Sequence, residues 1–108
     1  MNSCIFILRL IEDPSQENLH GNMKLLEVKA IYKYIKKGKV FNKIINLLIW
    51  GTQIDNVIKY YRKNDYIIVQ GFLRRFSEPN LKNFKLKDVR TEISVLNIYL
   101  LFPFIEIS

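Results

Sequence analysis

The sequence predicts an all-β fold, a five-stranded Greek-key barrel with one α-helix, and three observations carry this prediction. Five segments are rich in the β-branched and aromatic residues that strands favour. One segment, between the third and the fourth of them, has the three- and four-residue spacing of an amphipathic helix. The chain has 108 residues, 49% of them hydrophobic, which suits one domain with a core of its own.

The first three strands are expected at 3–11, 23–34 and 40–50. A loop follows the first strand and runs from Glu12 to Asn22, because Pro14 and its polar neighbours interrupt a strand. The basic run at 36–39, Lys-Lys-Gly-Lys, predicts the turn of a hairpin between the second and third strands. The third strand is apolar on both faces near its end, which is typical of a strand at the centre of a sheet or at an interface.

The helix is expected at 52–63, with Thr52 as a candidate N-cap and basic residues at its end. Its apolar face would consist of Ile54, Val57, Ile58 and Tyr61. The helix is thus placed between the third and fourth strands.

Two further strands are expected at 66–76 and 91–101, with a polar loop at 78–87 between them. Gly71 predicts a bulge or sharp bend in the first of these strands. The resulting order, three strands, a helix and two strands, is that of the oligonucleotide/oligosaccharide-binding barrel, the OB-fold.

Cysteine and histidine usage argues against a disulfide, a metal site and catalysis. The single Cys4 leads an apolar run, which predicts a buried, inert thiol. The single His20 is expected in a loop, and these two residues are too few soft ligands for a structural zinc site. The sequence also shows no catalytic triad of nucleophile, base and orienting group, because its one histidine is expected in a loop. We therefore expect no metal, no cofactor and no enzymatic activity.

Hydropathy argues against membrane insertion and secretion. The longest nearly apolar stretch, 95–105, contains Asn97 and Pro103 and is shorter than the roughly 18 residues of a membrane-spanning helix. The first residues lack the basic segment and the longer apolar run of a secretory signal. We expect no membrane partner.

Positive charge is concentrated in the middle of the chain. The net charge is +7, which favours a polyanionic partner. Between Val28 and Ile54 there is no acidic residue, and the lysines there are Lys29, Lys33, Lys36, Lys37, Lys39 and Lys43. Tyr32, Tyr34 and Phe41 are interleaved with them. A lysine-rich hairpin that serves solubility is the alternative interpretation, and the aromatic residues favour nucleic acid over it.

Three blocks resemble, in order, the bacterial-type single-stranded DNA-binding proteins of bacteria and organelles. Residues 50–64 begin with an aromatic-glycine pair, Trp50-Gly51, before an amphipathic helix with a basic end. Residues 67–74 resemble the family's valine-rich strand with Gly-x-Leu-Arg, and residues 91–101 resemble its closing Thr-Glu strand. Asp13-Pro14 also matches a pair in the family's first loop. The resemblance covers about half of the chain and implies an OB-fold that binds single-stranded DNA.

The sequence departs from this family in two places. The family commonly has a glycine-rich linker and an acidic tail that recruits partners, whereas here a domain at 1–102 is followed by a short extension at 103–108 without such a tail. Ile44 stands where the family often has an aromatic residue, which implies that one stacking platform is absent. The tailless primosomal replication protein N is therefore a related branch.

Stacking and charge together define the candidate site for single-stranded DNA. Bases stack on aromatic rings at about 1 to 3 kcal/mol each, and basic side chains follow the phosphates. Trp50 matches the family's aromatic residue, with a core role as its alternative. Phe72, Arg74 and Phe76 share a face that is outward if Val69 and Leu73 point inward, with a subunit interface as the alternative. The remaining candidates are Tyr32 and Tyr34, which share a strand face, and Lys33, Lys36, Lys37, Lys39 and Lys43.

The predicted function is sequence-independent binding of single-stranded DNA, which protects or organises it during replication or repair. A tailless interaction module of a replication assembly and an RNA-binding protein are the alternatives. The apolar third strand and C-terminal end predict a homodimer or homotetramer. Abundant Ile, Lys and Asn, which have A/T-rich codons, indicate a chloroplast or other plastid, or else the cytoplasm of an A/T-rich bacterium, in association with the nucleoid.

Overall fold

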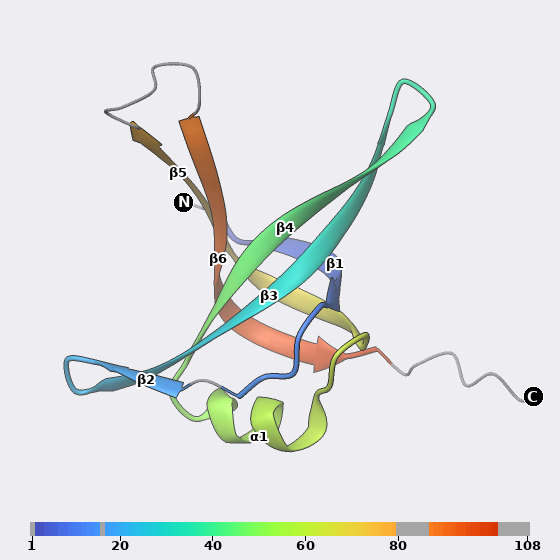
Figure 1. The fold of residues 1–108 in the computed structure, drawn as a ribbon. Coiled ribbons are helices and arrows are strands. Elements are labelled where there is room, and N and C mark those ends of the chain that lie inside the picture. Colours follow the sequence, from blue (N-terminus) through green and yellow to red (C-terminus); the bar gives the residue numbers. More distant parts are fainter. Residues whose placement is uncertain (1, 16, 80–86, 102–108) are drawn as a thin grey trace, which may run out of the picture.

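The computed structural model describes residues 2–15, 17–79 and 87–101 (Figure 1). The described residues form, in chain order, β1 (Cys4–Leu10), β2 (Glu17–His20), β3 (Met23–Lys36), β4 (Lys39–Trp50), α1 (Gln53–Tyr60), β5 (Tyr66–Pro79) and β6 (Lys87–Leu100). The fold is mostly β with one helix in these residues, as predicted. The extension expected at 103–108 and most of the loop expected at 78–87 lie outside the described residues.

Five of these strands close into a barrel. The sheet order is β1-β5-β6-β4-β3-β2, and a further pairing of β1 with β3 closes the ring. That closure uses only Arg9 opposite Ile31 and Leu10 opposite Ala30. The second narrow joint is the parallel pairing of β4 with β6, which brings residues 46–48 beside residues 92–94. The barrel is therefore held together by two short joints and three longer antiparallel pairings.

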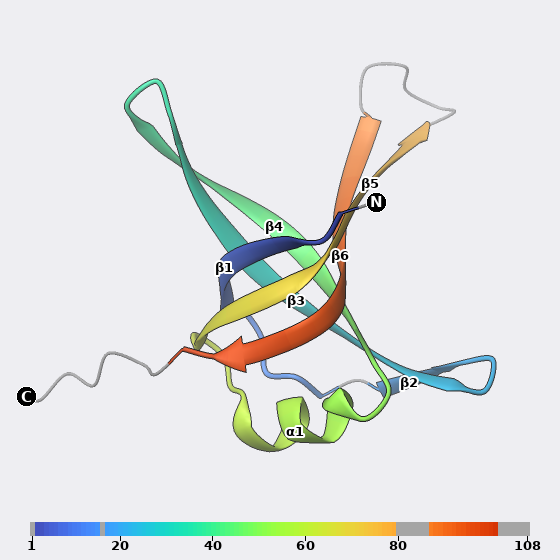
Figure 2. The same cartoon turned by 180° about the vertical axis from the view of Figure 1, so that it is seen from behind.

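Beyond these joints, two long hairpins leave the barrel as separate arms. The β3–β4 arm and the β5–β6 arm extend on the side away from α1 and diverge from each other in both views (Figures 1 and 2). β3 and β4 remain paired as far as Lys36 opposite Lys39. β5 and β6 remain paired as far as Pro79 opposite Lys87. Both arms are longer than the sequence predicted.

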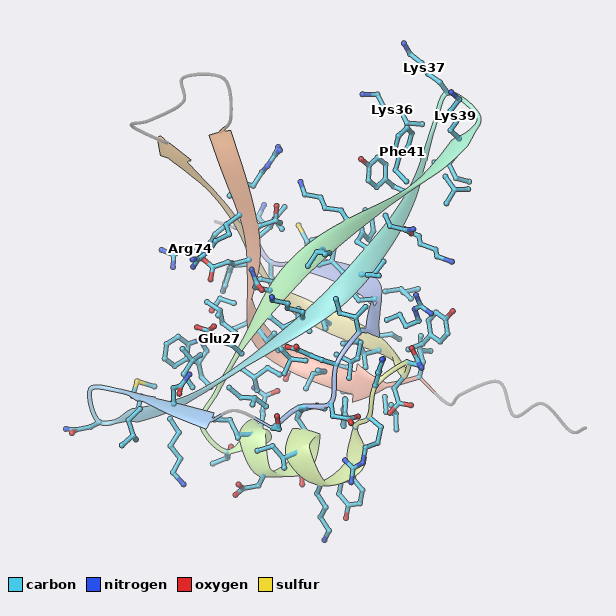
Figure 3. The ribbon with its side chains drawn as sticks, viewed as in Figure 1. Glu27, Lys36, Lys37, Lys39, Phe41 and Arg74 are labelled. Atoms are coloured by element: carbon cyan, nitrogen blue, oxygen red, sulfur yellow. The ribbon has the colours of Figure 1, made fainter. Side chains whose placement is uncertain are left out.

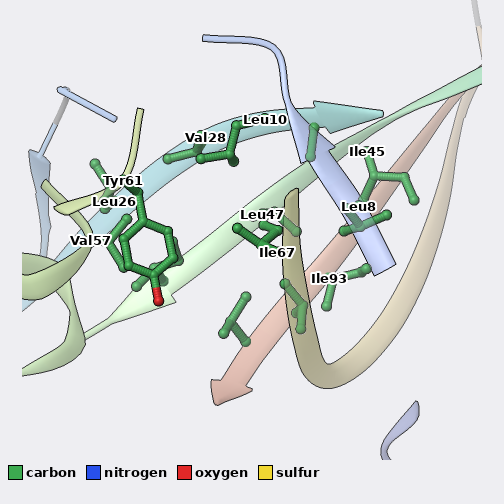
Figure 4. Close-up of a cluster of buried hydrophobic side chains, with 14 of the residues drawn as sticks. Leu8, Leu10, Leu26, Val28, Ile45, Leu47, Val57, Tyr61, Ile67 and Ile93 are labelled. Carbon is green, nitrogen blue, oxygen red and sulfur yellow. The ribbon is translucent and has the colours of Figure 1, made fainter. Parts of the chain in front are cut away.

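The core lies inside the barrel and is built by alternate residues of each strand. Figure 4 shows Leu8, Val28, Leu47 and Ile67, from four different strands, gathered around one centre. All of them are almost completely buried. Period-two alternation places such residues on one face of each strand, and burial of their apolar area is the main force that holds the barrel together.

Helix α1 covers the end of the barrel opposite the arms. It buries Ile54 and Val57 against the core, as their spacing predicted. Thr52 is the N-cap residue, although among the described residues its hydroxyl makes no capping hydrogen bond. Arg62 closes the other end, where its Nη1 donates to the carbonyl of Ile58 at 2.9 Å. The side chain of Tyr61 follows it into the core (Figure 4), and burial raises the pKa of its hydroxyl.

The prediction that the helix lies between the third and fourth strands is wrong, since α1 follows β4 in the structure. The reason is β2, an additional short strand formed by Glu17–His20 within the expected loop. Its mixed polar sequence carries no strand pattern. It pairs with residues 23–26 because the first part of β3 extends past the barrel and offers it an open edge. His20 therefore ends a strand instead of lying in a loop.

The prediction of a buried Cys4 is also wrong. Cys4 is exposed, because it pairs with Gly71 at the end of β1 that lies farthest from the closing pairs with β3. The apolar run that it leads enters the core only at Leu8 and Leu10.

Gly71 marks an irregularity of the β5–β6 pairing, as its sequence position predicted. The register shifts between Gln70 and Gly71, so that Leu96 is an extra residue on β6. A Cβ atom at Gly71 would collide with the main-chain oxygen of Ser94 and would lie 2.8 Å from Cγ2 of Ile93. Only glycine fits where the two strands approach so closely.

We expect Gly71→Ala to lower the free energy of unfolding by about 3 kcal/mol, because the oxygen that it meets can move only with its strand. Gly21→Ala is the matched control. Its Cβ would meet none of the described atoms within 4 Å, and its φ of 67° adds a strain of only about 1 kcal/mol. Urea unfolding followed by Trp50 fluorescence measures the stability of both variants. Equal destabilisation in the two variants would contradict the close-packing explanation.

Candidate nucleic-acid interface

One face of the β3–β4 arm carries aromatic and basic side chains together. In an antiparallel pair, residues that stand opposite each other point to the same side of the sheet. Tyr34 stands opposite Phe41, Lys36 opposite Lys39, and Tyr32 opposite Lys43. We call these six residues the ring face. They continue the strand face that, lower in the arm, turns Ala30 and Ile45 into the core.

The aromatic rings of this face form a continuous row. The ring centroids of Tyr32 and Tyr34 are 6.0 Å apart, with 18° between the ring planes. Those of Tyr34 and Phe41 are 5.5 Å apart, with 19° between the planes. Both distances lie in the range of offset stacking, about 4.5 to 7 Å, in which part of each ring remains uncovered. Phe6 of β1 extends the row with an edge contact to Tyr32, at 6.3 Å and 89°.

Lysines surround the outer end of this row. Lys36 and Lys39 are exposed beside Tyr34 and Phe41, and Lys43 is half-buried nearer the barrel. Lys37 occupies the turn with a φ of 52°, followed by Gly38 with a φ of 75°. Two positive φ angles are the requirement of the tightest hairpin turn, so Lys37 is held at the tip. Figure 3 shows Lys36, Lys37 and Lys39 at the end of the arm, next to Phe41.

The opposite face of the same arm is aliphatic. It consists of Ile31, Lys33, Ile35, Val40, Asn42 and Ile44. Ile35 and Val40 are 75% and 64% exposed. Lys33, which the sequence grouped with the other candidate residues, therefore points away from the ring face.

Three other candidate residues lie on a different surface, the outward face of the barrel. Trp50 stands opposite Leu25 and is half-buried. Phe72 stands opposite Ser94, and Arg74 opposite Glu92. In Figure 3, Phe41 is on the side of its arm that faces the β5–β6 arm, whereas Arg74 is on the far side of the latter. Phe76 belongs to β5, but its side chain is outside the described part of the chain.

Sequence reasoning missed two members of this region. Phe41 was noted among the interleaved aromatic residues but not as a site residue, although counting back across a two-residue turn places it opposite Tyr34. Arg75 stands opposite the buried Thr91. Arg75 therefore lies on the barrel-facing side of the β5–β6 arm, just as the ring face lies on the barrel-facing side of the β3–β4 arm. Strand alternation alone puts Arg75 on the side opposite Arg74, which weakens its claim as a site residue on sequence grounds.

A polar pocket lies at the base of the two arms, where β4 and β6 separate. It has a volume of about 430 Å³ and is lined by Glu27, Lys29, Ile44, Asn46, Arg90, Thr91 and Glu92. Within the described ranges, acidic, cysteine and histidine side chains do not gather into a group that would hold a metal ion. Those ranges contain no helix long and apolar enough to cross a membrane.

Comparison with known proteins points to one group of relatives, although no family model matches the chain. A Porphyra purpurea protein named "Putative single-stranded DNA-binding protein ycf41" is 32% identical over 82 residues, 76% of this chain and 70% of the relative. Proteins of the same name from Trieres chinensis and Pyropia yezoensis are 30% and 29% identical over 73 and 75 residues. These matches span 68% and 69% of this chain but only 65% and 64% of the relatives.

Solved structures share the fold. The SSB domain of a Synechococcus sp. protein superposes with a TM-score of 0.67 at 21% identity, over 92% of this chain and 94% of that domain. A small single-stranded DNA-binding protein from Streptomyces coelicolor gives a TM-score of 0.66 at 10% identity, over 93% and 94%. The barrel is thus of the SSB type. The sequence identity with the Porphyra purpurea relative, and the share of both chains that the match covers, show that this chain belongs to the ycf41 protein family.

Proposed function

We propose that the protein binds single-stranded DNA without sequence preference along the ring face, and that it performs no catalysis. The observation that carries this proposal is the row of offset rings bordered by lysines. Single strands expose base faces that stack on aromatic rings, whereas a duplex hides them. The name that the relatives share supports the same ligand.

Each part of the ring face has a role in this proposal. Tyr32, Tyr34 and Phe41 stack on bases, and Lys36, Lys37, Lys39 and Lys43 contact phosphates. Trp50, Phe72 and Arg74 form a second contact area on the outward face of the barrel, and Lys33 lies on the outward face of the neighbouring arm. Phe76 stays a candidate from the sequence. The two areas lie on opposite faces of the sheet, so a strand that contacts both of them passes around an arm.

The cellular role that fits such a protein is the protection or organisation of single-stranded DNA during replication or repair. The relatives are plastid-encoded, which supports a plastid location for this chain as well. Residues with A/T-rich codons, which the sequence contains in abundance, agree with that location.

We also propose that the chain forms a homodimer or homotetramer through the outward face of β1, β5 and β6. Side chains that stand opposite one another there are Ile7, Ile68 and Tyr99, with Ile5 and Tyr66 in the neighbouring rows. Ile5 is 70% exposed and Ile7 59% exposed. So apolar a sheet face in a strongly basic chain is typical of a protein–protein interface.

Removal of single rings tests the stacking role. We expect Tyr34→Ala and Phe41→Ala each to weaken oligo-dT binding by about 1 to 3 kcal/mol, because each removes a surface on which a base stacks. The matched controls are Ile35→Ala and Val40→Ala, which truncate neighbours on the opposite face of the same arm. Fluorescence anisotropy of a labelled oligonucleotide gives the affinities. Controls that cost as much as the ring variants would remove the ring face from the site.

Removal of lysines tests the proposed binding of phosphates. We expect the double variant Lys36→Ala, Lys39→Ala to bind oligo-dT more weakly and to flatten the plot of log affinity against log salt concentration, by about 0.7 for each phosphate that is no longer neutralised. The control removes Lys59 and Lys63, at the opposite end of the molecule, and should leave this slope unchanged. An identical slope in all three proteins would make the arm a solubility feature.

A mass measurement tests self-association. We expect light scattering to give a multiple of 12.9 kDa at micromolar concentration. Ile7→Lys should reduce it toward the monomer mass, because it places a charge on the apolar sheet face. Ile35→Lys, an equal change on the β3–β4 arm, should not. A wild-type mass near 12.9 kDa would refute the proposed interface.

A further inference from the structure

The polar pocket at the base of the arms differs from the ring face in position and in chemistry, because its β3 and β4 residues lie on the opposite, outward face of these strands. Parallel pairing of β4 with β6 begins at Asn46 beside Glu92, and the pocket opens where the two strands diverge from that point. Only Ile44 among its lining side chains is a large apolar one, and it is 56% exposed. The other lining residues all carry hydrogen-bonding groups.

The two carboxylates of the pocket are in different states. Glu92 is 7% exposed, and one of its oxygens lies 3.6 Å from Nη2 of Arg90. Glu27, labelled in Figure 3, is exposed, and among the described residues its side chain takes part in no hydrogen bond or ion pair. Lys29 is two residues further along the same face of β3, beside Asn46. Within the described part of the chain, the pocket therefore presents an unpaired carboxylate next to an ammonium group.

A second unsatisfied group lines the pocket. The hydroxyl oxygen of Thr91 is buried, and among the described residues it has no hydrogen-bond partner. Buried polar groups without partners are uncommon, and each calls for an explanation. Because this oxygen is closed to solvent, a ligand in the pocket does not contact it in this arrangement.

The arrangement of these groups selects a base and disfavours a phosphate. For a phosphate, repulsion by Glu27 and Glu92 offsets the attraction of Lys29 and Arg90. A carboxylate such as that of Glu27, in contrast, accepts two parallel hydrogen bonds from adjacent N–H donors. Guanine alone among the four bases has two such donors side by side on its Watson–Crick edge, at N1 and N2, with an acceptor, O6, next to them. Thymine has one ring N–H between two acceptors. Cytosine and adenine each have an amino group beside an acceptor nitrogen.

We propose that this pocket binds the Watson–Crick edge of an unpaired guanine, with the Glu27 carboxylate accepting from N1 and N2 and the Lys29 ammonium donating to O6. Ile44 supplies an apolar surface for the base. The proposal rests on the proposed function, since a bound strand brings the guanine in along the second contact area of Trp50, Phe72 and Arg74, which lies on the same outward face as the pocket. It adds a preference for one base at one point of a site that otherwise ignores sequence.

The test compares oligonucleotides of twelve nucleotides that differ in one central base within oligo-dT. We expect guanine to bind about five- to tenfold more tightly than thymine, the lower range for one bidentate contact to a base. 7-Deazaguanine, which keeps the Watson–Crick edge, should equal guanine. Hypoxanthine, which lacks the N2 amino group, should bind only slightly more tightly than thymine. Equal affinities for guanine, hypoxanthine and thymine would overturn the proposal.

Two variants locate the preference. Glu27→Gln replaces one acceptor with a donor and should abolish the guanine preference while oligo-dT is still bound. Asp55→Asn removes the same charge on α1 and should keep the preference. A preference that survives in Glu27→Gln would overturn the assignment to this pocket. If the wild-type protein bound none of the oligonucleotides, the proposed function itself would fail, an outcome distinct from equal binding of all of them.

Discussion

The narrow closure of the barrel is the constraint on which the rest of the structure depends. β1 and β3 are joined by two residue pairs, and β4 and β6 by three. Because these joints are short, the strands on either side of them separate and continue as two arms. The arms retain the alternation of the barrel strands, so their barrel-facing sides are continuous with the core. The same pleat that buries Ala30 and Ile45 thus leaves Tyr32 half-buried and presents Tyr34 and Phe41 to solvent a few residues further on.

Local patterns in the sequence predicted much of this fold. The spacing of Ile54 and Val57 located the helix, since only an α-helix puts both on one buried face. Alternation in each long segment located the five barrel strands. Gly71 located the irregularity in the β5–β6 pairing, because a glycine inside a strand indicates a bulge or a close approach of the neighbouring backbone. Family resemblance and strand order together gave the barrel topology, which no single segment contains.

Features that depend on distant partners could not be predicted. β2 exists because β3 offers it an edge, and nothing within Glu17–His20 signals that edge. Cys4 is exposed because β1 begins far from the closing pairs, although its own neighbours are apolar. The candidate site residues were grouped by composition, whereas strand register divides them between two surfaces and turns Lys33 away from the other lysines.

The long sequence separation across the barrel joints has a consequence for how the chain folds. The β3–β4 pairs join close neighbours, as in Lys36 and Lys39, and form after little loss of chain entropy. Other pairs of the barrel join residues far apart in the sequence, as in Asn46 with Glu92 between β4 and β6 and Cys4 with Gly71 between β1 and β5. Topologies rich in such distant pairs fold slowly, in roughly milliseconds to seconds. We therefore expect the hairpin with its exposed aliphatic residues, Ile35 and Val40, to form before the barrel closes, and the three lysines at its tip to oppose its association by charge repulsion.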